Sequence, residues 1–141
     1  MAASNRFGRT ISVIAPPVDG RATVECLIAD ECATIDEVAV RTAVFWLAVQ
    51  AERTRLDAVI VVPTLKAATC LSDALPSHSL DALIAGNIVR MNRGSLLLLT
   101  PDEVMPQTRR HQVVLAIGLT DRELAKVERM NPAALCVLRR A

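Results

Sequence analysis

The sequence predicts an α/β fold in three layers, with a largely parallel sheet and helices on both of its faces. Four segments, at residues 58–62, 96–99, 113–117 and 133–138, are apolar at every position. Strands that are buried on both faces have this composition, whereas half-exposed strands alternate between apolar and polar residues. Helical patterns fall between most of these segments, which is typical of βα units.

Composition indicates one domain and excludes several classes of protein. The 141 residues are 52% hydrophobic, enough for a single core, and we expect a flexible N-terminus at residues 1–9 before one domain over 10–141. No apolar run reaches the roughly 18 residues of a membrane-spanning helix. Together with the lack of a secretory leader pattern, this predicts a cytoplasmic protein without a membrane partner.

The cysteines and histidines do not form a metal site or a recognisable catalytic pattern. The four cysteines include no CxxC pair, so we interpret them as reduced thiols and predict no metal and no cofactor. Glycine-rich phosphate loops of the GxGxxG or GxxxxGK type are also missing from the sequence. Ser77 and His78 are adjacent, which disfavours a catalytic pair, and we expect Ser79 to cap a helix instead.

Two hairpins are expected beside the parallel strands. Asp19-Gly20 separates two β-rich runs near the N-terminus and predicts a tight turn between them. A second hairpin is possible near residues 88–100, with Gly94 at positive φ in its turn. The alternative for that region continues the preceding helix through Met91, but Gly86-Asn87 is a helix stop signal and favours the hairpin.

Three helix starts are marked by a threonine placed three residues before a glutamate. In this capping box the hydroxyl accepts a bond from one free N–H, and the carboxylate accepts one from another. The three pairs are Thr34 with Glu37, Thr100 with Glu103, and Thr120 with Glu123.

The helix expected at residues 34–55 is apolar nearly all round. Between Val38 and Val49 only Arg41 and Thr42 are polar, whereas a surface helix normally has a single apolar stripe. A second layer of the same chain or another subunit must cover the additional side. Under the second alternative, the chain forms a homo-oligomer or binds a protein partner. The predicted interface residues are Val40, Val44, Trp46 and Leu47.

A small anionic ligand could bind at the carboxyl ends of the strands, where ligands of parallel sheets usually lie. The loops after the first and third apolar segments carry the polar groups for such a site. The candidate ligand-binding residues are Thr64, Lys66, Thr120, Asp121 and Arg122. The simpler alternative is that the threonines cap helices and the charged side chains are solvated.

Nucleic-acid binding is a weaker alternative. Arginines gather at Arg90, Arg93, Arg109 and Arg110, and contacts to phosphate need no aromatic residues. However, the net charge is only +1 and aromatic residues make up 2% of the chain, so solvated arginines explain the cluster more simply.

These observations favour a noncatalytic α/β domain that acts by association or in regulation through the helix at 34–55, with a small anion at the strand ends as a possible addition. The alternative is a small hydrolase or transferase that acts on a phosphate- or carboxylate-bearing substrate. The sequence names no catalytic residues for it, so whether the chain is an enzyme stays open.

Overall fold

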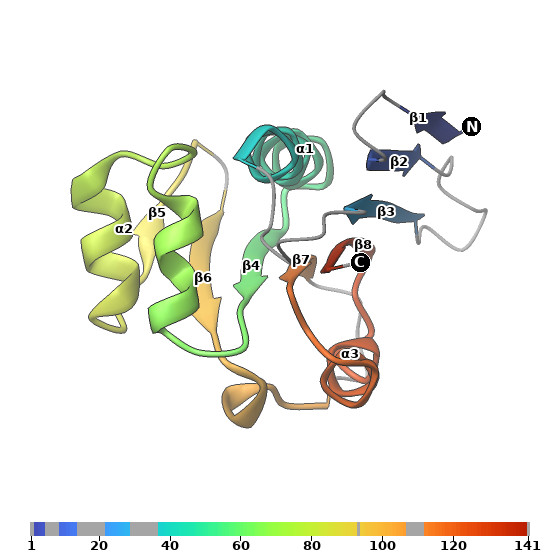
Figure 1. Cartoon of the computed structure of the whole chain (residues 1–141). Helices are drawn as coiled ribbons and strands as arrows, with labels where there is room; N and C mark the ends of the chain where they lie inside the picture. The colour runs from blue at the N-terminus through green and yellow to red at the C-terminus, as the bar shows by residue number, and fades with distance from the viewer. Residues whose placement is uncertain are drawn as a thin grey trace.

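The computed structural model describes residues 2–4, 9–13, 22–28, 37–92, 94–106 and 112–140. Helices and strands alternate over most of this length, as Figure 1 shows. The elements in chain order are β1 (Ala2–Ser4), β2 (Arg9–Val13), β3 (Ala22–Ile28), α1 (Glu37–Thr54), β4 (Asp57–Val61), the 3-10 helix η1 (Lys66–Leu71), α2 (Ser77–Ile84), β5 (Val89–Arg90), β6 (Ser95–Leu99), the 3-10 turn η2 (Pro101–Glu103), β7 (Gln112–Ile117), α3 (Asp121–Glu128) and β8 (Ala134–Arg140).

The strands form one mostly parallel sheet, which confirms the predicted α/β class. Their order is β1-β2-β3-β8-β7-β4-β6-β5. The five strands from β3 to β6 in this order run parallel to one another. The four apolar segments become β4, β6, β7 and β8, while the parallel pairing of β3 with β8 was not predicted.

Two apolar clusters hold the sheet and the helices together. Successive side chains of a strand point to opposite faces, so β4 contributes Ala58 and Ile60 to one cluster and Val59 and Val61 to the other. Helices α1 and α2 pack in the first cluster, and α3 packs in the second. In Figure 1, β7 and β8 lie between α1 and α3.

Strands β4 and β7 are buried as the sequence predicts, but β6 is not. From Ala58 to Val61 and from Val113 to Ile117 every side chain is buried. Along β6, Leu96 and Leu98 are buried whereas Leu97 and Leu99 are only half-buried. The prediction of burial on both faces is therefore wrong for β6, which lies near the edge of the sheet with only the two-residue strand β5 beyond it.

Antiparallel strands flank the parallel ones. Strand β2 pairs with β3, and β1, which lies inside the segment predicted to be flexible, pairs with β2. The turn predicted at Asp19-Gly20 lies outside the described residues. At the opposite edge β5 pairs with β6, and Gly94 before β6 has a φ of +91°.

The helix ends follow the local sequence closely, with one correction. Capping boxes are present at Thr100 and Thr120, as predicted, while Thr34 lies outside the described residues. Helix α2 begins at Ser77 after Pro76, so Ser79 lies in its first turn and does not cap it. Gly86 ends α2 at a φ of +88° as a Schellman motif, in which its N–H and that of Asn87 bond to carbonyls of the last turn.

Candidate functional site

The predicted anion site lies where two neighbouring strands are followed by helices on opposite faces of the sheet. Strands β4 and β7 are adjacent and parallel, so their carboxyl ends lie at the same edge of the sheet. After β4 the chain enters η1, which packs in the cluster of α1, whereas after β7 it enters α3 in the opposite cluster. This divergence is the switch-point arrangement at which open α/β sheets bind ligands.

The two threonines of this site already have local hydrogen bonds. The Thr64 hydroxyl accepts a bond from the Ala67 N–H at 3.2 Å. The Thr120 hydroxyl accepts one from the Glu123 N–H at 3.2 Å, and the Glu123 carboxylate accepts the Thr120 N–H at 3.0 Å. These bonds are those of turns and helix caps, so both threonines have a role in local structure without any ligand.

The charged members of the predicted site lie on the surface. Lys66, Asp121 and Arg122 are all exposed, the first in η1 and the others in the first turn of α3. Neither of the two cavities described below is lined by any of the five predicted residues. An anion at this edge of the sheet therefore stays a prediction of the sequence.

The adjacent pair Ser77 and His78 lies on a helix, as does Cys70, one of the four cysteines. Ser77 and His78 occupy the first two positions of α2 and are exposed, and Cys70 is half-buried in η1 against the first cluster. Within the described part of the chain, no group of three or more His, Cys, Asp and Glu side chains could hold a metal ion. Likewise, no described helix is long and apolar enough to cross a membrane.

Of the arginines considered for nucleic-acid binding, only Arg90 can be placed. It is exposed on the short edge strand β5. Arg93, Arg109 and Arg110 lie outside the described residues, so the predicted cluster stays a prediction.

Helix α1 has two different sides, and this corrects the predicted interface. Its inner side packs in the core through residues that recur about every four positions, namely Ala39, Val40, Ala43, Leu47 and Ala51. Val40 is 1% exposed and Leu47 is 2% exposed, so neither offers surface to a partner. Both were predicted at the interface because an all-round apolar helix does not reveal which side faces the sheet. Val44 and Trp46 are half-buried and pack against the first cluster.

The outer side of α1 exposes large apolar side chains that the sequence did not single out. Phe45 is 69% exposed, Val38 is 53% exposed and Val49 is 36% exposed. A signal for this orientation exists in the sequence, because Ala39, Ala43 and Ala51 share one side. Small side chains allow a helix to approach a sheet closely, although Val40 and Leu47 also lie on this inner side.

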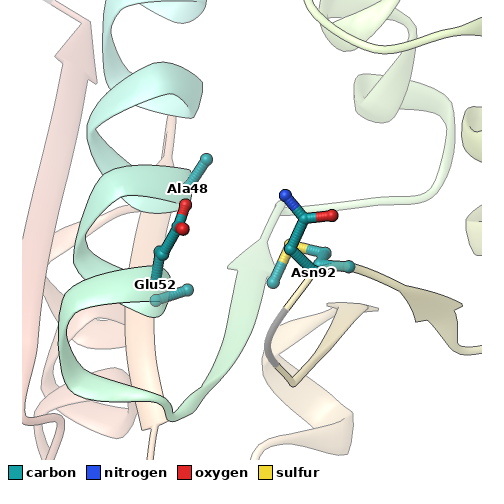
Figure 2. Close-up of a pocket in the computed structure, with 5 residues that line it drawn as sticks. Ala48, Glu52 and Asn92 are labelled. Atoms are coloured by element: carbon teal, nitrogen blue, oxygen red, sulfur yellow. The ribbon is translucent and has the colours of Figure 1, made fainter.

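A cavity opens beside this outer side. It has a volume of about 240 Å³ and lies between α1 and the turn that joins β5 to β6. Ala48, Ala51 and Glu52 line it from α1, and Met91 and Asn92 line it from the turn. Figure 2 shows Ala48 and Glu52 projecting from α1 toward Asn92 across the opening.

A second cavity lies between η2 and α3. Its volume is about 250 Å³, and its lining includes Asp102, Lys126 and Arg129. The Lys126 ammonium lies 4.0 Å from the Asp102 carboxylate, and both side chains are open to solvent. A pair this exposed contributes little to stability and leaves no buried polar group aimed into the cavity.

The geometry thus separates two candidate sites, the edge beside β4 and β7 and the outer side of α1. Comparison with known proteins assigns neither of them: no protein-family model matches the chain, and no match is found among curated proteins or among solved structures.

Proposed function

We propose that this chain is a noncatalytic α/β domain that acts by association, and that the outer side of α1 is its contact surface. The observation that carries the proposal is the 69% exposure of Phe45 on a helix whose opposite side is part of the core. Isolated exposed apolar residues are common, but Phe45 lies with Val38 and Val49 on a single helix face.

Burial of Phe45 against a partner is more favourable than its exposure to water. Burial of a phenylalanine side chain contributes about 1.5 to 3 kcal/mol relative to leaving it in water. Aromatic side chains are also among the residues that dominate the binding energy of interfaces. Because α1 is held by the core on its inner side, it can present Phe45 without a change in backbone conformation.

The proposal includes the three-layer arrangement predicted from the sequence. The division of core residues between two clusters, one with α1 and α2 and one with α3, supports it. In such an arrangement α1 is an outer layer, and a partner that covers it would add a further layer. The cytoplasmic location stays a prediction of the sequence.

Substitution of Phe45 tests the proposal. We expect the full chain to associate at micromolar concentrations and Phe45→Glu to be monomeric over the same range, because a carboxylate cannot be buried in an apolar contact without large cost. Sedimentation velocity over a range of concentrations measures both species.

Met105→Glu is the matched control, since Met105 is exposed to a similar extent, 65%, but lies after η2 and outside α1. We expect it to associate as the unmodified chain does. A full chain that sediments as a monomer at all concentrations, or equal behaviour of the two variants, contradicts the proposal.

A further inference from the structure

The outer side of α1 carries a stripe of four residues whose spacing is symmetric and whose charges and side-chain sizes are opposite at its two ends. Arg41, Phe45, Ala48 and Glu52 are all exposed and are separated by four, three and four positions. This spacing places the four side chains along one face of the helix. We call them the α1 stripe.

The order within the α1 stripe is self-complementary. When two copies of the helix run antiparallel about a twofold axis between Phe45 and Ala48, Arg41 of each copy faces Glu52 of the other. Phe45 of each copy then faces Ala48 of the other, so a large side chain meets a small one. In a parallel pair, by contrast, Arg41 would face Arg41 and the two Phe45 rings would collide.

The cavity beside α1 provides room for the ring. Ala48, which faces Phe45 in the antiparallel pair, is one of its lining residues, and Ala51 and Glu52 are two others. Cavities of about 150 Å³ are large enough to bind benzene in other proteins. The volume here, about 240 Å³, exceeds that of such a cavity, and Met91 is among the lining residues.

We infer that the partner of the α1 surface is a second copy of this chain, bound antiparallel with Phe45 of each copy in the cavity lined by Ala48 and Met91 of the other. Reciprocal Arg41 and Glu52 pairs set the register. The inference rests on the proposed function and adds to it the identity and orientation of the partner. In a twofold interface each contact occurs twice, because the same two residues meet again with the subunits interchanged.

The size of the helix predicts the strength of the dimer. The 18 residues of α1 span about 27 Å, so a pair of such helices makes a small interface. The two inserted rings are its main anchors. We accordingly expect a dissociation constant in the micromolar range, where charge changes have measurable effects.

Charge reversal tests the register. In an antiparallel dimer, position 41 of each copy faces position 52 of the other. Either Arg41→Glu or Glu52→Arg therefore creates two pairs of like charges. We expect each to weaken self-association by about tenfold or more, measured by sedimentation equilibrium at low salt. The double variant Arg41→Glu/Glu52→Arg restores opposite charges in both pairs and should associate to within about threefold of the unmodified chain.

Arg53→Glu is the control, because it makes the same change of charge on the same helix one position beyond the α1 stripe. We expect it to retain association. Circular dichroism establishes that each variant is folded. Ala48→Phe is a second test, since it fills the cavity from within and should abolish association without adding charge.

The outcomes separate this inference from the proposed function. If Phe45→Glu abolishes association but the double variant associates no better than the single ones, the contact surface stands and the antiparallel register is wrong. If Ala48→Phe associates normally, the insertion of Phe45 into the cavity is wrong. If the unmodified chain is monomeric throughout, both proposals fail together.

Discussion

Single positions decide how closely the segments of this chain can approach one another. Gly94 is the clearest case, because a Cβ atom there would lie 2.9 Å from the Leu56 carbonyl oxygen and 3.2 Å from the Asp57 carboxylate. The same carboxylate oxygen accepts the Ser95 N–H at 3.0 Å. The turn before β6 is thus held against the start of β4 by contacts that leave space only for glycine.

Gly94→Ala should therefore lower the free energy of unfolding by about 1 to 3 kcal/mol, since it combines a backbone clash with strain at a φ of +91°. Urea denaturation measures the loss. Gly86→Ala is the comparison, because Gly86 has a similar φ of +88° but no atom within 4 Å of its Cβ position. We expect a smaller loss there, and equal losses would show that the contact with Leu56 is unimportant.

The orientation of α1 illustrates which properties of a residue could not be predicted. Phe45 and Leu47 are both large and apolar, yet one is 69% exposed and the other 2%. Hydrophobicity alone does not separate them, because the helix is apolar on both sides. The difference depends on which side meets β4, β7 and β8, and this is set by contacts distant in sequence.

At the scale of elements, the helix starts are predicted best. The capping box of α3 depends on four neighbouring residues only, so its hydrogen bonds follow from the local sequence. The same box explains why Thr120 is a weak indicator of ligand binding: its hydroxyl stabilises the start of α3 whether or not a ligand is bound.

Thr120→Ala should cost about 1 kcal/mol of stability, because it removes the acceptor for the Glu123 N–H. Thr120→Ser retains the hydroxyl and should remain within a few tenths of the unmodified chain. Thermal or urea unfolding compares the two variants. A serine variant that loses as much as the alanine variant would indicate that the methyl group of Thr120, and not its hydroxyl, stabilises α3.

Strands were predicted well where both of their neighbours are long. Strands β4 and β7 have parallel partners on each side, and their continuous apolar runs are buried throughout. The similar run in β6 is fully buried on one face only: Leu96 and Leu98 lie in the cluster of α1 and α2, whereas Leu97 and Leu99 are half-buried against the cluster of α3. Composition describes a strand but not its place in the sheet, so the position of β6 near the edge was not predictable from its own residues.

At the scale of the whole molecule, the chain is expected to be more stable as its concentration rises. The proposed dimerisation through α1 would stabilise the folded state by mass action, since the unfolded chain lacks the assembled surface. An increase of about tenfold in concentration should therefore raise the Tm by a few degrees. Differential scanning calorimetry measures this shift, and Phe45→Glu should have a Tm independent of concentration.

The two candidate sites differ in how much of each could be predicted from the sequence. The meeting of the loops after β4 and β7 follows from the general rule for parallel sheets, and the structure places those strands side by side. For the proposed contact surface on α1, the sequence predicts the helix but not the set of residues. Two of the four predicted residues, Val40 and Leu47, are in the core, while Phe45 and Ala48 were left out.

The strand order has a consequence for the synthesis of the chain on the ribosome. β8 is the last strand of the sequence, yet it lies in the interior of the sheet and joins β3 to β7. While residues 134–140 are still inside the exit tunnel, the nascent β1 to β3 lack β8, the strand that connects them to the remaining sheet. Strand β3 can therefore join the sheet through β8 only after residues 134–140 have been synthesised and have left the exit tunnel.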